Sequence, residues 1–136
     1  MKLSFLLTTL LFSFYLTSFS QHINQEVILE NQQPFLLGEI TAKTLSSNSY
    51  RSWYEQNFEN YEADQNKIDV LKDKLSSFNI LVFMGTWCGD SKREVPRFFK
   101  ILESADFPLG NLKIVALDKR KESYKKSPQG EEWGLN

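Results

Sequence analysis

The stretch that decides the fold is Phe-Asn-Ile-Leu-Val-Phe-Met-Gly-Thr-Trp-Cys-Gly-Asp-Ser, residues 78–91. Its first half, 78–84, is short, almost wholly apolar and β-prone, which predicts a strand covered on both faces. The second half is a turn, after which apolar residues recur at helical spacing over 95–102. Another apolar run, 112–117, follows. This strand–helix–strand order predicts a βαβ unit over 78–118, with parallel strands and a right-handed crossover.

Two helices are predicted before this unit. Five aromatic residues recur at spacings of three and four, which places them on one helix face: Tyr50, Trp53, Tyr54, Phe58 and Tyr61. We interpret this stripe as the buried face of a helix on a sheet, and a ligand- or partner-binding face is the alternative. A second helix begins at a capping Asp64 and turns its apolar residues inward: Ile68, Leu71 and Leu75.

The N-terminal third divides into a leader and a polar lead-in. Met1-Lys2, an apolar stretch over 3–16, and small residues at 18 and 20 predict a signal peptide over 1–20, cleaved before Gln21. An uncleaved membrane anchor is the alternative reading. We therefore expect an exported protein, periplasmic or secreted, in contact with a membrane only if the leader stays attached. Residues 21–45 are predicted to be a lead-in with a short edge strand over 34–40.

Composition excludes several kinds of chemistry. The chain has 136 residues, 41% of them hydrophobic, which suits one domain, expected over 46–136. A net charge of −1 argues against nucleic acid as the main partner. The single cysteine, Cys88, excludes an internal disulfide and a multi-cysteine zinc site. The single histidine, His22, excludes a His-rich metal site and a Cys–His pair elsewhere in the fold. We expect no cofactor and no metal.

Cys88 is the candidate nucleophile. It follows the carboxyl end of a buried strand and precedes a helix, where free backbone N–H groups and the helix dipole favour a thiolate. Lys92 and Arg93 are expected to add to this effect, whereas Asp90 should oppose it. We expect the net pKa shift of the thiol to be downward. The alternative is a buried, inert cysteine.

These residues carry a resemblance to the thioredoxin superfamily. An apolar strand followed by Trp-Cys-Gly-Asp-Ser-Lys, with a proline eight residues after the cysteine, is similar to the active-site segment of these proteins. The resemblance implies that Cys88 is the attacking cysteine, Trp87 the flanking tryptophan and Gly89 the first spacer. Lys92 and Pro96 take the places of the following lysine and the helix-kinking proline. It also implies an α/β fold, thioredoxin-like and three-layered, with a central βαβ unit preceded by helices.

Three residues depart from the family pattern. Ser91 stands where the resolving cysteine belongs, and a serine hydroxyl cannot expel a mixed disulfide. Ser91 can still donate a hydrogen bond to the Cys88 thiolate. Val82 takes the place of the buried acid that assists proton transfer, and Asp90 replaces the usual spacer proline. An external thiol is therefore expected as the resolving partner.

The resemblance also implies further strands and a closing helix after the βαβ unit. Only 18 residues follow Asp118, and Pro128 among them is a poor match for the family's cis-proline. We expect a C-terminally truncated chain with one sheet edge uncovered. The basic residues between 119 and 126 are expected to be a solvated loop, with contact to a phosphate or an anionic surface as the alternative.

The leading hypothesis is a thioredoxin-like thiol–disulfide exchange protein of the cell envelope. Cys88 would attack a disulfide-bearing protein or a small-molecule mixed disulfide, and an external thiol would resolve the adduct. One alternative is a non-catalytic binding or chaperone-like module with the same fold. The other is an inactive truncated product.

Overall fold

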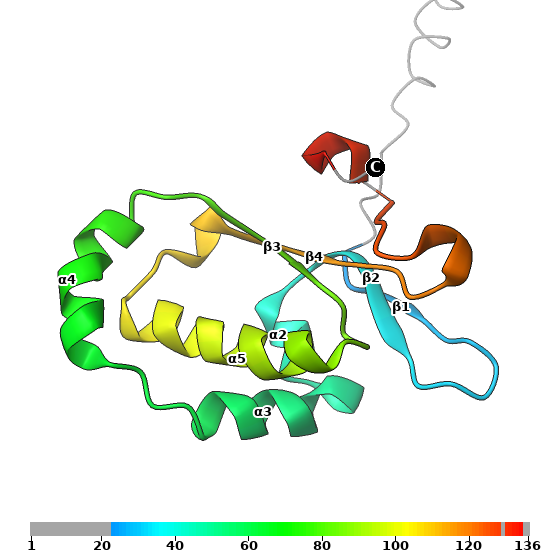
Figure 1. Ribbon diagram of the computed structural model, residues 1–136, viewed down its shortest axis with the longest axis horizontal. Coiled ribbons are helices and arrows are strands. Elements are labelled where there is room, and N and C mark those ends of the chain that lie inside the picture. Colours follow the sequence, from blue (N-terminus) through cyan, green and yellow to red (C-terminus); the bar gives the residue numbers. More distant parts are fainter. Residues whose placement is uncertain (1–22, 129, 135–136) are drawn as a thin grey trace, which may run out of the picture.

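A computed structural model describes residues 23–128 and 130–134 (Figure 1). The predicted signal peptide over 1–20 and His22 lie outside the described residues. Within the described part of the chain, no helix is both long and apolar enough to cross a membrane.

Four strands form one mixed sheet: β1 (Gln25–Val27), β2 (Phe35–Ile40), β3 (Ile80–Met84) and β4 (Leu112–Ala116). Their order is β1-β2-β4-β3, and β3 runs parallel to β4 with Ile80 opposite Leu112. The predicted βαβ unit is therefore confirmed, with α5 (Gly89–Ser104) as its crossover helix. The other two neighbouring pairs, β1 with β2 and β2 with β4, are antiparallel. The α/β fold class predicted from the sequence is confirmed.

The prediction of an edge strand over 34–40 is wrong. β2 lies inside the sheet, between β1 and β4, and Phe35, Leu36 and Leu37 are all buried. Three consecutive apolar residues suit a strand that is covered on both faces, which a solvated edge would not provide. The predicted lead-in over 21–45 thus supplies two strands of the sheet and the short helix α2 (Ala42–Leu45).

The aromatic stripe forms the buried face of a helix, as interpreted from its spacing. A 3-10 turn, η1 (Asn48–Tyr50), leads into α3 (Arg51–Glu59), which lies beside α5 below the sheet (Figure 1). Tyr50 is 3% exposed, and the rings of Trp53, Tyr54 and Phe58 pack against the core. Tyr61 lies beyond the end of α3. Apart from Tyr50, these rings are only partly buried, and Tyr54 and Phe58 also line a surface pocket, so the helix face is shared between the core and solvent.

The helix α4 (Gln65–Leu75) begins as predicted but buries less than predicted. The Asp64 carboxylate caps it by accepting a hydrogen bond from the Lys67 N–H, 3.3 Å away. Ile68 is buried, whereas Leu71 is 55% exposed, which corrects its predicted inward position. The physical reason is that α4 crosses the far end of α5 and does not lie on the sheet (Figure 1). A groove there is lined mostly by apolar residues, Leu71 and Phe98 among them.

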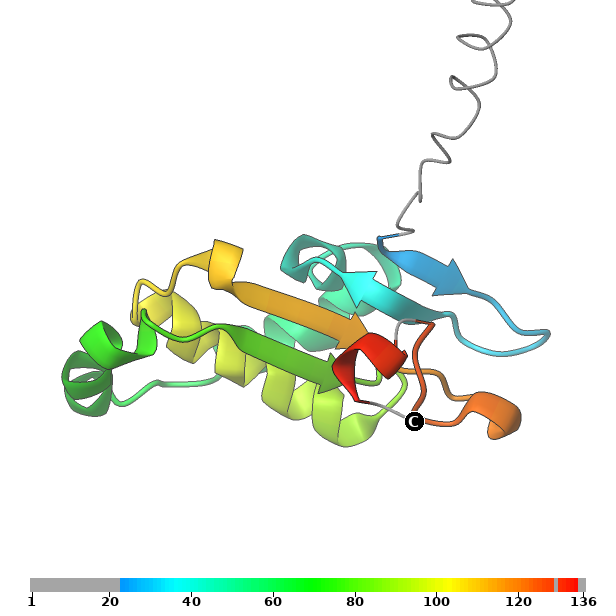
Figure 2. The same ribbon diagram turned by 90° about the horizontal axis from the view of Figure 1, so that it is seen from above.

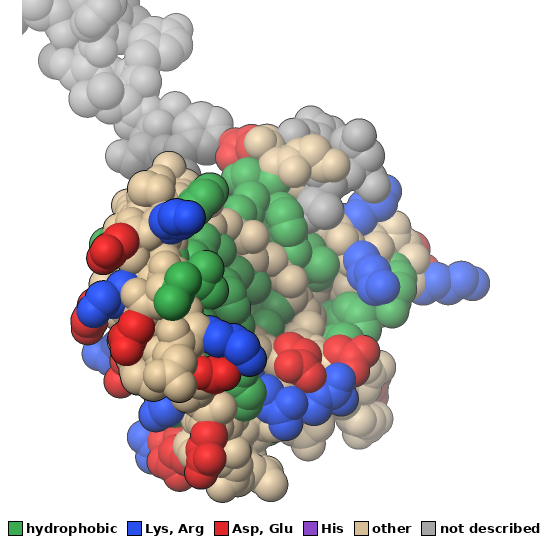
Figure 3. Space-filling model, turned by 60° about the vertical axis from the view of Figure 1, so that its left-hand side comes forward, with side chains coloured by type: hydrophobic (Ala, Val, Ile, Leu, Met, Phe, Trp, Pro, Cys, Tyr) green, Lys and Arg blue, Asp and Glu red, His purple; other side chains and the backbone are tan. Residues whose placement is uncertain are grey.

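The two faces of the sheet are covered unequally. Figure 2 shows α3 and α5 on one face and the short turn η4 (Gly130–Trp133) near the other. On that second face, the Phe83 ring lies 6.4 Å from the Trp133 ring. In the described residues, β3 pairs on one side only. Leu81 on this strand is 39% exposed, and Figure 3 shows hydrophobic side chains in a band on the face turned forward there.

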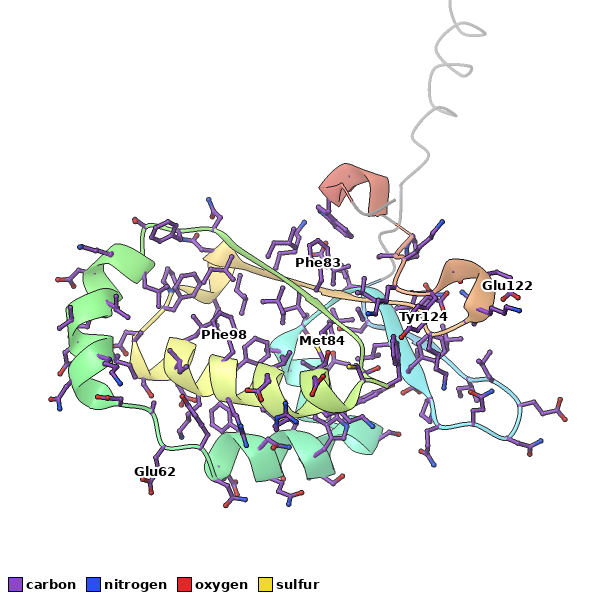
Figure 4. The ribbon with its side chains drawn as sticks, viewed as in Figure 1. Glu62, Phe83, Met84, Phe98, Glu122 and Tyr124 are labelled. Carbon is purple, nitrogen blue, oxygen red and sulfur yellow. The ribbon has the colours of Figure 1, made fainter. Side chains whose placement is uncertain are left out.

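Two short 3-10 turns lie on either side of β4 in the chain. The turn η2 (Leu109–Asn111) leads into β4, and η3 (Lys121–Ser123) follows β4. Side chains alternate along β3, so that Met84 points toward α5 and Phe83 toward the opposite face (Figure 4). The candidate site begins at residue 85, directly after Met84 at the end of β3.

Candidate active site

The turn between β3 and α5 holds Cys88 at the start of the helix. Cys88 is the N-cap residue, with extended backbone angles of φ −85° and ψ 127°. Its N–H donates to the Gly85 carbonyl at 2.9 Å, and its carbonyl accepts from the Lys92 N–H at 3.0 Å. The side chain is half-buried and forms no disulfide. The thiol therefore lies where the first backbone N–H groups of α5 have no partner within the helix.

The pKa of the Cys88 thiol is lowered from its ordinary value. The largest cause is a hydrogen bond from the backbone N–H of Ser91, and the N–H of Asp90 and the hydroxyl of Ser91 act in the same direction. Partial burial and the negative charge of Asp90 oppose them. Donors at a helix start stabilise the thiolate over the thiol, and the thiolate is the nucleophilic form.

Ser91 links the thiol to the strand end. Its Oγ accepts a hydrogen bond from the Gly85 N–H at 3.2 Å. Since the serine oxygen is used as an acceptor there, its own hydrogen is free to be donated to Cys88. Residue 91 thus stabilises a thiolate without being able to form a disulfide with it.

Arg93 does not lower the pKa of the Cys88 thiol, contrary to the expectation from the sequence. Its guanidinium donates to Asp90 Oδ1 at 2.9 Å and also contacts Glu94, so it is engaged on the exposed side of α5. Lys92 is half-buried beside the turn. The lowered thiol pKa consequently depends on hydrogen bonds from the backbone and from Ser91, not on a cation of the first helical turn.

Buried residues around the turn hold it in place. The Thr86 hydroxyl, itself buried, accepts from the Leu36 N–H of β2 at 2.9 Å. Pro96 is buried inside α5, where it lacks the N–H that would bond to the Lys92 carbonyl. At Gly85 a β-carbon would lie 2.7 Å from the Trp87 ring, whereas around Gly89 there is open space. Gly85 is therefore a packing requirement, and Gly89 is not.

Trp87 connects the turn to a loop that sequence reasoning did not include in the site. Its Nε1–H donates to the Leu117 carbonyl at 2.9 Å, and its ring lies 5.2 Å from the Tyr124 ring. Asp118 lies between these contacts and is 2% exposed. The sequence contained one signal for this loop, which is that Asp118 follows a buried strand closely. The carboxyl ends of parallel strands share one edge of the sheet, so Asp118 could have been expected near the turn after β3.

Asp118 organises this loop as a charged acceptor. Its carboxylate accepts from Arg120 N–H at 2.8 Å and from the Ser123 hydroxyl at 2.7 Å, and it also pairs with the Arg120 guanidinium. Burial alone would raise the pKa of Asp118, but these hydrogen bonds outweigh it and hold the pKa at about 2. In the folded protein, Asp118 is therefore ionised at neutral pH.

A buried acid and a metal ion are two kinds of group that can assist a thiol. Val82, at the position of the family's buried acid, is half-buried and contacts the core. In residues 23–128 and 130–134, no group of three or more His, Cys, Asp or Glu side chains is placed to hold a metal ion. The reactive group that the turn itself presents is the Cys88 thiol, whose pKa is lowered.

A parallel βαβ unit with a cysteine at the start of its helix defines a thiol-bearing α/β protein of the thioredoxin type. A family model described as thioredoxin matches residues 38–132. The chain belongs to this thioredoxin family. The match begins within β2 and includes the turn with Cys88 and the loop after β4. Comparison with curated proteins and with solved structures gives no significant match.

Proposed function

We propose that the protein is a monothiol thiol–disulfide exchange protein in which Cys88 is the nucleophile. The observation that carries this proposal is the half-buried thiol at the N-cap of α5, whose pKa is lowered by the N–H of Ser91. Membership of the thioredoxin family supports it. We further propose that the reaction takes place outside the cytoplasm, on the basis of the leader predicted over 1–20.

The exchange proceeds in two steps. The Cys88 thiolate attacks one sulfur of a substrate disulfide, an S–S bond forms to Cys88, and the other substrate sulfur leaves as a thiolate. An external thiolate then attacks the substrate sulfur of this mixed disulfide, and Cys88 leaves as the thiolate. The external thiol supplies the electrons, and Ser91 serves as a hydrogen-bond donor in both steps. No second cysteine of this chain takes part, since Cys88 is the only one.

The first test is the pH dependence of Cys88 alkylation in the folded protein and in denaturant. We expect a lower midpoint in the folded protein, because the donors at the start of α5 exist only there. Identical midpoints would refute an activated thiol. Cys88→Ala should remove all disulfide exchange, and activity retained in that variant would exclude Cys88 from the reaction.

A second variant tests the geometry. Ser91→Cys places a thiol where the structure has a hydroxyl on the same helix turn, and it should allow resolution without an external thiol. We expect a rise in dithiol-type turnover, followed as loss of the mixed disulfide by mass spectrometry. Binding of a partner protein that survives Cys88→Ala, in the absence of exchange by the native chain, would instead favour the non-catalytic module.

A further inference from the structure

We propose that residues 118–126, the basic loop, are a recognition surface for disulfide substrates that carry negative charge. This inference rests on the proposed exchange at Cys88 and adds the class of substrate. Its basis is a rigid loop with a surplus of positive charge, which the Trp87 ring holds beside the reactive thiol.

The basic loop is closed on itself. The Asp118 N–H donates to the Lys126 carbonyl, and the Lys125 N–H donates to the Asp118 carbonyl, both at 2.9 Å. Inside this closure the buried Asp118 carboxylate accepts hydrogen bonds from Arg120 and Ser123. Because these bonds exist without a ligand, little loop ordering remains to oppose binding.

The loop is fixed next to Cys88 by two contacts of Trp87. The indole donates to the Leu117 carbonyl directly before the loop, and it packs on the Tyr124 ring within it. Tyr124 is 51% exposed, so its outer side is open to solvent. In Figure 4, Tyr124 lies on the side of the loop toward the start of α5, whereas Glu122 lies on the outer side. A substrate seated against Tyr124 would therefore lie next to the thiol.

The charge of the loop is mostly uncompensated. Five cations stand against two acids over 118–126. The Asp118 carboxylate engages Arg120, and the Lys119 ammonium donates to the Gln33 carbonyl at 3.1 Å. The other three lysines are exposed, and none forms an ion pair within the described residues: Lys121, Lys125 and Lys126. The Lys125 ammonium lies 5.5 Å from the centre of the Tyr124 ring. Positive charge thus lies beside a half-exposed aromatic ring on a loop with a surplus of cations, an arrangement that attracts anions and accelerates their encounter.

The test compares two aromatic disulfides that differ in charge, 5,5′-dithiobis(2-nitrobenzoate), a dianion, and 4,4′-dithiodipyridine, which is neutral at pH 7. Each forms a mixed disulfide with Cys88 and releases an aromatic thiol, whose absorbance gives the rate. The test variant is Lys125→Asn with Lys126→Gln, because Lys125 has a φ of 60°, which asparagine tolerates. The matched control is Lys72→Gln with Lys74→Gln, which removes two exposed lysines of α4 at the other end of the molecule.

At low salt, we expect the test variant to react about fivefold more slowly with the dianion and equally fast with the neutral disulfide. The difference should shrink at 1 M salt, where charges are screened beyond about 3 Å. The control should keep the wild-type rates with both reagents. Equal rates of wild type and test variant with the dianion would overturn the inference and leave the exchange proposal intact. If neither reagent reacts with folded Cys88 faster than with the denatured chain, the exchange proposal fails and the inference fails with it.

Discussion

Replacing Gly85 by alanine should displace the Trp87 indole from the turn before Cys88. A β-carbon at residue 85 would lie 2.7 Å from Trp87 Cε2 and 2.9 Å from Nε1. Carbon atoms in favourable contact are about 3.5–4.0 Å apart, so the ring has to move. The change is steric and not conformational, because Gly85 is not among the residues with positive φ.

The size of the effect follows from what the indole contacts. Moving it breaks the hydrogen bond to the Leu117 carbonyl, worth about 1 kcal/mol. It also separates the Trp87 and Tyr124 rings, a contact worth about 1 kcal/mol. We therefore expect Gly85→Ala to lower the free energy of unfolding by about 2 kcal/mol, within the range of about 1–3 kcal/mol for overpacked sites.

The assay is urea unfolding followed by far-UV circular dichroism, with Gly89→Ala as the matched control. A β-carbon at residue 89 has nothing within 4 Å, and alanine is preferred over glycine in a helix by up to about 1 kcal/mol. Gly89→Ala should thus keep or raise the unfolding midpoint. The reasoning is refuted if Gly85→Ala unfolds at the wild-type midpoint, or if both variants lose the same stability.

Three further outcomes are expected. Ser91→Ala should move the midpoint of Cys88 alkylation to higher pH by removing a hydroxyl donor, yet leave it below the midpoint in denaturant because the backbone N–H remains; an unchanged midpoint would exclude the hydroxyl. The pKa of Asp118 falls from 3.8 to about 2 on folding, so the unfolded chain binds the proton first as pH drops. About 2 kcal/mol of stability should then be lost between about pH 4 and pH 2, and urea unfolding should show no such loss in Asp118→Asn. Asp64→Ala should cost about 1 kcal/mol by uncapping α4, whereas Asp69→Ala should change unfolding by less than about 0.5 kcal/mol; equal losses would argue against the cap.

Local patterns predicted the centre of the fold. The apolar runs of β3 and β4, with an amphipathic segment between them, are short-range signals, and the structure confirms the parallel pair and its crossover helix. The place of Cys88 at the start of α5 followed from the same pattern. These features depend on residues close together in the chain, where periodicity is most informative.

Long-range contacts were beyond the reach of such patterns. The interior position of β2 depends on its pairing with β4, and nothing near residues 35–40 reports that partner. The contact of Tyr124 with Trp87 likewise joins residues that only the folded chain brings together. Leu71 was misassigned because helical spacing identifies an apolar face without showing whether a neighbour covers all of it.

The pairing of β2 with β4 also has a consequence for the order of folding. Gly38 lies opposite Ala116, so this ladder closes a loop over residues 38–116, whereas the βαβ unit closes the much shorter segment 80–112. Closing the longer loop costs more entropy, and we expect β2 to dock after the βαβ unit has formed. The Leu36 N–H reaches the Thr86 hydroxyl only at that point. The turn before Cys88 would therefore gain its buried hydrogen bond to β2 late, after the donors at the start of α5 have already formed.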